Sequence, residues 1–316
     1  MRSITTVQGD ISPGQLGFCQ SHEHLSIARG YPAQIFPHQC IDDEDLSSRE
    51  LEQYRQAGGC AVVDAQPVGC GRDARMLEKI SRRSGVHIIC STGFHKMLFY
   101  PEGHWVYSFT IDELACLYIE ELTRGMYVEC DTGLPGRQTA CRAGQVKAAL
   151  DAGELTGQYK KMFRAAAKAA NHTKSALMVH IESGSDPVAL ADFLQNEGVD
   201  PQRMIFCHMD RSIPDLAVHK KLCARGIYME YDTVARPRCH SDEREAEIVL
   251  EMLEAGYESR LLMSLDVTRD RLLSYGGTVG LGYIRKTFLP ALSRRGVSTE
   301  QLESIFVTNP GRVFAR

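Results

Sequence analysis

Several features that would point to particular classes of protein are scarce or missing. The 316 residues contain one tryptophan, and the loops after the predicted strands hold few aromatic residues, which argues against a pocket for bulky neutral esters. No run of 18 apolar residues occurs, so we expect no transmembrane helix. The first nine residues have no apolar signal core, and we therefore expect no secretion. The net charge of −4 gives no support for a nucleic-acid partner, which usually requires a basic face.

Two further absences concern cysteine and glycine motifs. The eleven cysteines are odd in number and show no C-x-x-C spacing, so we expect reduced thiols in a cytoplasmic enzyme rather than a disulfide framework. No G-x-G-x-x-G motif follows a predicted strand, which argues against a dinucleotide-binding fold.

What the sequence does contain is a regular alternation of short apolar runs with helical patterns. The predicted strands cover 17–25, 60–65, 86–92, 142–149, 176–182, 203–209, 226–232 and 260–266. The helical patterns between them cover 47–57, 73–84, 110–125, 156–175, 186–197, 213–225 and 241–255. Capping boxes at Ser47–Glu50, Thr110–Glu113 and Ser298–Gln301 predict three helix starts.

Strict β/α alternation predicts a parallel sheet, and eight repeats at this length favour the α/β class and a single (β/α)8 TIM barrel over residues 1–316. We expect a short N-terminal strand or hairpin before the barrel and helices at the C-terminus. No composition shift or linker divides the chain. In such barrels the chemistry lies at the C-terminal ends of the strands.

The stretch Phe18–Leu25 carries the first candidate site. His22 and His24 are two residues apart, and alternate side chains of a strand share a face. Two neutral imidazoles that converge in this way form half of a site for a divalent metal. The alternative is a pair of surface histidines in a turn.

Other candidate ligands also fall at or near predicted strand ends: His180, His208, Asp266 and Lys147. Each has a plain alternative. The histidines could be buried and satisfied by the backbone, Asp266 could cap a helix, and the lysine could reach water. Because all of them fall at successive barrel strands, one metal centre explains the set more simply than several coincidences.

Four histidines, a carboxylate and a lysine exceed the needs of one catalytic ion. Two ions about 3.5–4 Å apart fit this set better. Lys147 is the exception, because an ammonium group repels cations. Reaction of its neutral amine with carbon dioxide would give a carbamate, whose two oxygens could bridge two metals.

The ordered set of motifs resembles the phosphotriesterase-related branch of the amidohydrolase superfamily, over essentially the whole chain. H-x-H alone is not specific, but the combination is. The segments that carry the resemblance are Gly17–Leu25, Gly144–Lys147, Val179–His180, Cys207–Asp210, Leu265–Asp266, Ser91–Phe94, Tyr275–Tyr283 and Phe306–Pro310.

The resemblance implies that His22, His24 and Asp266 bind the more buried of two divalent ions and that His180 and His208 bind the more exposed one. Lys147 matches the carbamylated lysine that bridges both ions. Zinc is the first expectation, with manganese or cobalt as alternatives. Asp266 would also take the proton of a metal-bridging hydroxide as it attacks. A homodimer is a family-level expectation.

The segments Gly93–Lys96 and Tyr275–Tyr283 are similar to those of members that act on sugar lactones, some of them phosphorylated. The residues that follow strand ends and could bind such a small molecule are His95, Lys96, Arg236, Arg238, Arg269, Arg271 and Tyr275. Loop arginines can also be merely solvated. We expect a lactonase. The alternatives are hydrolysis of phosphotriesters or N-acyl amino acids, or a barrel that binds a ligand without turnover.

Overall fold

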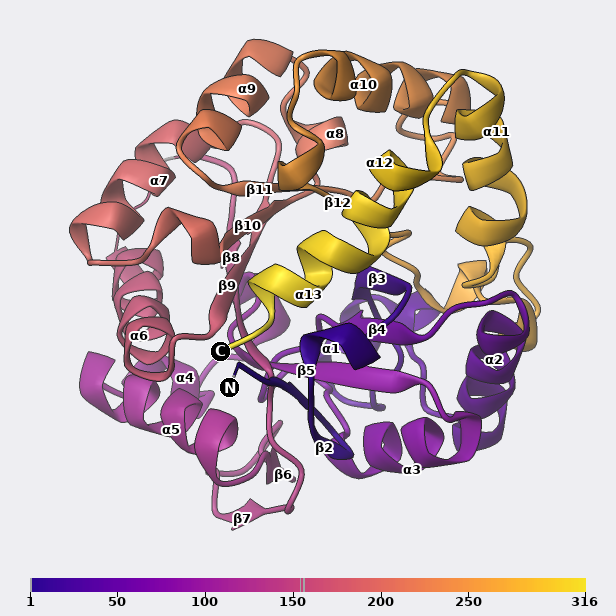
Figure 1. The fold of residues 1–316 in the computed structure, drawn as a ribbon. Coiled ribbons are helices and arrows are strands. Elements are labelled where there is room, and N and C mark those ends of the chain that lie inside the picture. The colour runs from indigo at the N-terminus through magenta and orange to yellow at the C-terminus, as the bar shows by residue number, and fades with distance from the viewer. Residues whose placement is uncertain (1, 154, 156) are drawn as a thin grey trace.

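The computed structural model describes residues 2–153, 155 and 157–316, and its centre is an eight-stranded parallel sheet. The sheet curls into a nearly closed barrel surrounded by helices (Figure 1), which confirms the predicted (β/α)8 architecture. Its strands in spatial order are β3 (Cys19–Glu23), β4 (Ala61–Asp64), β5 (His87–Gly93), β8 (Gln145–Leu150), β9 (Ala176–Ile181), β10 (Met204–Cys207), β11 (Tyr228–Tyr231) and β12 (Leu261–Met263).

The first and last barrel strands meet through the acidic residue of the H-E-H stretch. The two oxygens of Glu23 accept backbone N–H groups of Leu265 at 2.8 Å and Val267 at 2.9 Å. The N–H group of Asp266 donates to the carbonyl of His22 at 3.1 Å. Because side chains alternate along β3, Glu23 points toward this seam while its two histidine neighbours point elsewhere.

The helices form the outer ring in Figure 1 because each buries one apolar face against the strands. Those after successive strands are α2 (Glu44–Gln56), α3 (Ala74–Ser84), α5 (Ile111–Thr123), α6 (Gly157–Thr173), α7 (Pro187–Asn196), α9 (Leu216–Ala224) and α10 (Asp242–Glu254). Shorter helices are α1 (Tyr31–Ile35), α4 (Trp105–Ser108), α8 (Met209–Ser212), α11 (Leu289–Arg294), α12 (Thr299–Glu303) and α13 (Asn309–Val313). The predicted start of the α6 helix, Thr156, lies outside the described residues.

The N-terminal end of the barrel is closed by both ends of the chain. In the hairpin of β1 (Ile4–Thr6) and β2 (Gly9–Ile11), the turn residue Val7 donates its N–H group to the carbonyl of Ile88, near the start of β5, at 2.9 Å. Ile4 and Phe314 pack in one core cluster with residues inside the barrel. The opposite end, where the strands finish, is left for the site.

One of the three predicted helix starts is wrong. The α2 helix begins at Glu44, because the carboxylate of Asp43 accepts the N–H group of Leu46 at 2.9 Å and caps the helix before Ser47 is reached. Ser47 lies inside the helix, and its hydroxyl donates to the carbonyl of Leu25 at 3.2 Å. The boxes that begin at Thr110 and Ser298 are confirmed.

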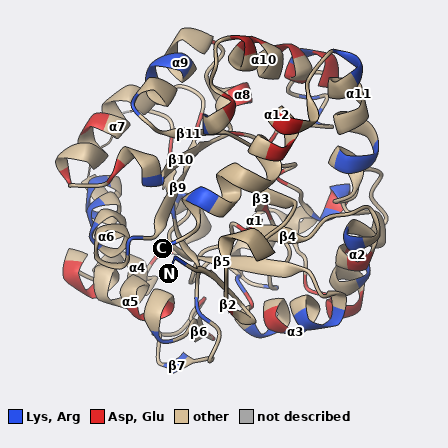
Figure 2. Cartoon of the chain, in the orientation of Figure 1, with Lys and Arg blue, Asp and Glu red and all other residues tan. Residues whose placement is uncertain are grey.

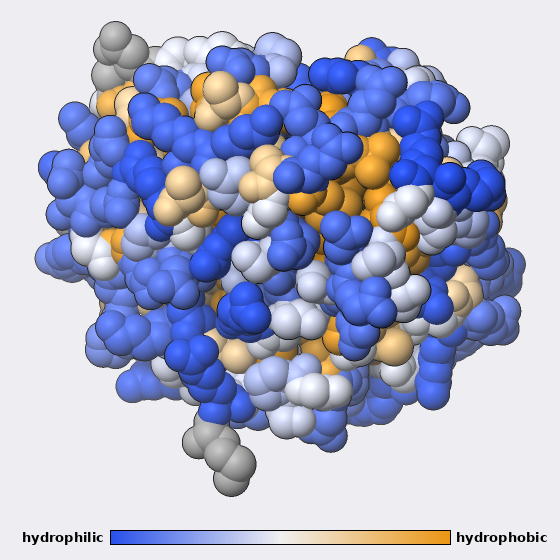
Figure 3. Space-filling view, turned by 45° about the horizontal axis from the view of Figure 1, so that its top comes forward, coloured by the Kyte–Doolittle hydropathy of each residue, from blue (hydrophilic) through white to orange (hydrophobic). Residues whose placement is uncertain are grey.

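A small hairpin between α5 and β8 was not predicted. It pairs β6 (Tyr127–Val128) with β7 (Arg137–Gln138), strands too short to show a period-two pattern. In Figure 2 charged residues of both signs are interspersed along the outer helices. The face in Figure 3 is mostly hydrophilic, with some hydrophobic areas. Among the described residues, no helix is long and apolar enough to span a membrane. All eleven cysteines are free.

Candidate metal centre

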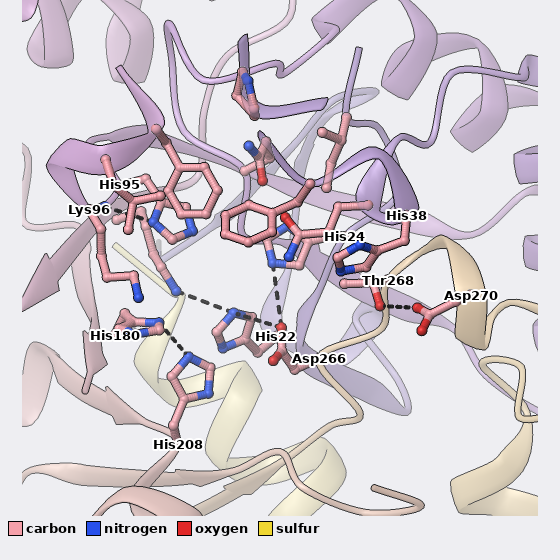
Figure 4. Close-up of a pocket in the computed structure, with 18 of the residues that line it drawn as sticks. His22, His24, His38, His95, Lys96, His180, His208, Asp266, Thr268 and Asp270 are labelled. Carbon is pink, nitrogen blue, oxygen red and sulfur yellow. Dashed lines mark hydrogen bonds and ion pairs between the residues drawn. The ribbon is translucent and has the colours of Figure 1, made fainter. Parts of the chain in front are cut away.

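Residues from five strands meet at one cavity of about 260 Å³ at the C-terminal end of the barrel. Figure 4 shows the four histidines and Asp266 turned toward one another at this cavity. The six residues that the sequence predicts as metal ligands all line it: His22, His24, Lys147, His180, His208 and Asp266.

The first group of donors lies where β3 meets the loop after β12. Nε2 of His24 is 3.5 Å from Oδ1 of Asp266, and Nε2 of His22 is 3.7 Å from the same oxygen. All three side chains are buried. One donor atom from each lies within 4.8 Å of the others, a spacing that can hold a metal ion.

The second group comes from β9 and β10. Nδ1 of His180 and Nε2 of His208 are 2.7 Å apart, and the other ring nitrogen of His208 is 2.7 Å from Asp232. Such a carboxylate partner fixes the orientation of a metal-binding imidazole. The backbone of His208 is left-handed, with φ of 63°, which turns its side chain inward directly after the strand.

Lys147 lies in β8, the strand that pairs with β9. Its side chain is 1% exposed, and its Nζ is 3.3 Å from Nε2 of His22. No carboxylate of the described residues lies within 4 Å of this amine. Gly93 in the adjacent strand makes room, because a Cβ atom there would lie 1.9 Å from the Lys147 carbonyl oxygen. The fold therefore brings a buried amine to a cluster of imidazoles.

Burial holds three of the histidines, His22, His180 and His208, neutral. Burial and the nearby Lys147 lower the pKa of His22 to about 4, and burial likewise lowers the pKa of His180 and His208. Burial alone would raise the pKa of Asp266, but Arg236, His24 and Arg211 together hold it well below its usual range. Neutral imidazoles and an ionised carboxylate are the forms that bind divalent cations.

The donor set therefore fits divalent metals. Imidazole nitrogens and carboxylate oxygens are the usual ligands of zinc and of similar transition ions. Nδ1 of His24 is buried and has no hydrogen-bond partner among the described residues. A further group, Asp232 with His208 and Asp266, also brings its donor atoms within 4.8 Å of one another.

Four of the seven predicted substrate-binding residues line the cavity, namely His95, Lys96, Arg236 and Arg238. Nζ of Lys96 is 2.6 Å from Glu182, and Arg236 donates to Asp266. Arg238 is exposed and has no ion-pair partner in the described part of the chain. The wall of the cavity is therefore rich in cationic groups.

Arg269, Arg271 and Tyr275 do not line this cavity, and this expectation is corrected. Arg271 is buried and donates to carbonyl oxygens of the barrel rim, including that of Val234 at 2.7 Å. The guanidinium of Arg269 donates to the Cys40 carbonyl and lies over the ring of Tyr275. The Tyr275 hydroxyl in turn donates to a backbone carbonyl at the start of α2. These side chains connect loops to one another and to the barrel rim. Their position after a strand end in the sequence does not reveal these contacts.

Sequence reasoning missed three charged residues of the site. Asp232 contacts His22 and His208, and Arg211 lies 3.0 Å from both Asp232 and Asp266. Glu182 accepts from Lys96 and lies 3.2 Å from His180. Asp232 and Glu182 end predicted strands, as the predicted ligands do, and that signal could have identified both.

The comparisons with known proteins agree with this geometry. The model of the Phosphotriesterase family matches residues 2–314. The chain is 29% identical to a phospho-furanose lactonase of Mycoplasmopsis synoviae (strain 53), over 98% of this chain and 91% of the relative. It is 28% identical to an N-acetyltaurine hydrolase of Danio rerio, over 98% and 97%. The crystal structure of a lactonase from Listeria monocytogenes superposes with a TM-score of 0.89 at 27% identity, over 99% of this chain and 98% of that chain. The chain belongs to the phosphotriesterase family and is a metal-dependent hydrolase.

Proposed function

We propose that this protein opens a sugar-type lactone by hydrolysis at a centre of two divalent ions, and that its natural substrate carries an anionic group. The observation that carries the proposal is the meeting of four histidines, Asp266 and a buried lysine at one cavity with a cationic wall. Relatives named as a phospho-furanose lactonase and a lactonase support the choice of substrate class.

His22, His24 and Asp266 would hold the more buried ion, and His180 with His208 the more exposed one. Lys147 would serve both as a carbamate: its neutral amine adds to carbon dioxide, forming an N–C bond and releasing one proton. Zinc is the first candidate, with manganese or cobalt as alternatives. When bound, such ions supply a nucleophile at neutral pH, because coordination lowers the pKa of water from about 15.7 toward 7.

Asp266 handles the proton. Its carboxylate is held in place by Arg211 at 3.0 Å and Arg236 at 3.1 Å, and it stays ionised until it accepts the proton of the attacking water. As the acyl carbon–oxygen bond of the ring breaks, Asp266 returns that proton to the leaving ring oxygen. The product is a hydroxy acid, and Asp266 is ionised again for the next turnover.

The cationic wall supports an anionic substrate. Lys96, Arg211 and Arg236 already pair with carboxylates of the site, whereas Arg238 is exposed at the cavity without such a partner among the described residues. A guanidinium can bind a phosphate or carboxylate through two parallel hydrogen bonds. We propose Arg238 as the residue that holds this group, with His95 and Lys96 as further contacts from the same cavity.

The test is a panel assay on the metal-loaded protein. The panel pairs γ-lactones of sugar acids with their phosphorylated forms, and includes an aryl phosphotriester. We expect phosphorylated lactones to give the highest kcat/KM, and Arg238→Ala to raise KM for them far more than for the uncharged forms. A clear preference for the aryl phosphotriester would overturn the proposal.

A second candidate is hydrolysis of an anionic N-acyl amide. The same cationic wall suits it, and the relative from Danio rerio is named for N-acetyltaurine. The panel therefore includes N-acetyltaurine and N-acetyl amino acids. Amide turnover that exceeds lactone turnover would favour this candidate.

Three wider expectations belong to the same proposal. We propose that residues 1–316 act as one hydrolase domain, that the enzyme works in the cytoplasm, and that it is a homodimer. The eleven free cysteines fit a reducing compartment. Sedimentation of the purified protein tests the dimer.

A further inference from the structure

A second cluster of potential ligands lies behind the wall of the candidate metal centre. It consists of Asp210 on α8, His240 in the loop before α10, and Glu245 in the first turn of α10. One donor atom from each lies within 4.8 Å of the others, and Nε2 of His240 contacts Oε2 of Glu245. We call these three residues the α8–α10 cluster.

The cluster contains a buried oxygen without a partner. Glu245 is fully buried, and its Oε1 has no hydrogen-bond partner among the described residues. Asp210 is 5% exposed and accepts the N–H group of Thr233 at 2.8 Å. Two carboxyl groups therefore lie close together with unused acceptor positions, an arrangement that requires a proton or a cation between them.

No arginine or lysine of the described residues forms an ion pair with these two carboxyl groups, although burial raises the pKa of both and the charge of Arg211 nearby lowers it. The guanidinium of Arg211 is directed to Asp232 and Asp266, and that of Arg244 pairs with Glu247 on the helix surface. Neither Asp210 nor Glu245 has a Lys or Arg partner within 4 Å in the described part of the chain. Buried carboxylates without a counter-charge are unfavourable, so the geometry leaves room for an added cation.

An ion could reach the cluster from solvent. Asp210 and His240 line a cavity of about 470 Å³ that is separate from the candidate metal centre, with Arg211 contributing to the wall of both. Other residues of this cavity come from α8 and α10, including Ser212 and Ile248.

We propose that the α8–α10 cluster is a further divalent-cation site with a structural role. One imidazole with two carboxylates suits a borderline transition ion such as Zn²⁺ or Mn²⁺ more than Ca²⁺ or Mg²⁺, which prefer oxygen ligands throughout. The inference does not depend on the reaction proposed above.

The site would join two parts of the molecule. Asp210 is two residues beyond His208, whereas His240 ends the loop that carries Arg236 and Arg238. An ion bound by all three residues would fix that loop against α8 and thereby hold the cationic wall of the candidate metal centre.

The first test counts metal. Chelator-stripped protein is reloaded with Zn²⁺, desalted, and its metal content is measured by mass spectrometry. We expect Glu245→Gln and His240→Gln to retain one equivalent per chain fewer than wild type, and the control Glu247→Gln on the exposed face of α10 to match wild type. Equal content in all four proteins would overturn the proposal. If wild type retains only one equivalent and Glu245→Gln retains none, the result would support the α8–α10 cluster as a metal site. It would also count against a two-metal centre.

The second test uses the wild-type protein, so it does not rely on a variant that folds. Crystals soaked in Mn²⁺ are examined by anomalous diffraction. A peak within bonding distance of all three residues supports the site. Density showing Asp210 and Glu245 in direct contact with no peak between them would mean that a shared proton occupies the position, and would overturn the proposal.

Discussion

At the scale of single residues, the site depends on which side chains are charged. Burial keeps His22, His180 and His208 neutral, and the arginines around Asp266 keep that carboxylate ionised. Lys147 is the residue whose role depends most on chemistry that the sequence does not encode. Its position beside His22 explains how it could join two ions once its charge is reversed.

Replacing Lys147 tests this directly. We expect Lys147→Ala to lose bound metal and nearly all activity, because the shared ligand disappears. A short-chain carboxylate added to the buffer should restore part of the rate by supplying the missing oxygens. Metal content and kcat are measured with and without the additive, and a variant that retains both without it would contradict the assignment.

Replacing His180 distinguishes the loss of a metal ligand from the loss of side-chain packing. We expect His180→Ala to lower kcat by about 100-fold or more, since even residues that only orient a ligand typically cost 10–100-fold. The melting temperature of the metal-free protein should change by no more than a few degrees. His38→Ala, from the same cavity, is the control. A fully active His180→Ala protein would remove His180 from the site.

At the scale of the elements, the sequence predicted strand order and strand ends well because buried parallel strands are short apolar runs between helices. It predicted the meeting of His22, His180 and His208 for the same reason. The sequence did not predict a helix start where two caps compete, or the partners of a side chain whose contacts lie far along the chain. Nothing near Ser47 reveals that Asp43 caps the helix first, and nothing near Arg271 reveals that its partners are rim carbonyls.

Glu23 offers a test of how the barrel closes. Both oxygens of Glu23 accept backbone N–H groups across the seam. In Glu23→Gln, the side-chain NH2 group would replace one acceptor and face one of these N–H donors. We expect a loss of about 1–3 kcal/mol in the free energy of unfolding. Urea denaturation measures it, with Glu44→Gln on the exposed face of α2 as the control. Equal stability of both variants would show that the seam does not depend on Glu23.

At the scale of the whole molecule, the two ends of the barrel have different tasks. The N-terminal hairpin and α13 fill one end with apolar side chains, and the other end holds the polar cavity. Ligands from five strands mean that any bound ion links distant parts of the chain. The stability of the protein should therefore depend on divalent metal.

We expect chelation to lower the melting temperature of the wild-type protein. An ion present at about 100 times its dissociation constant stabilises the folded state by about 2.7 kcal/mol. For a chain of this size that corresponds to about 4 °C. Scanning calorimetry before and after reloading measures the change, and His180→Ala should show a smaller one. Melting temperatures unaffected by chelator would argue against resident metal.

The left-handed backbone of His208 and Asp266, with φ of 63° and 49°, has an evolutionary consequence. Residues with a Cβ atom adopt this conformation at a cost of roughly 1–2 kcal/mol each, which glycine avoids. Glycine at either position would relieve that cost but remove a proposed ligand, so a screen for stability in the presence of chelator does not protect these side chains. Directed evolution of this scaffold needs a selection for catalysis in every round.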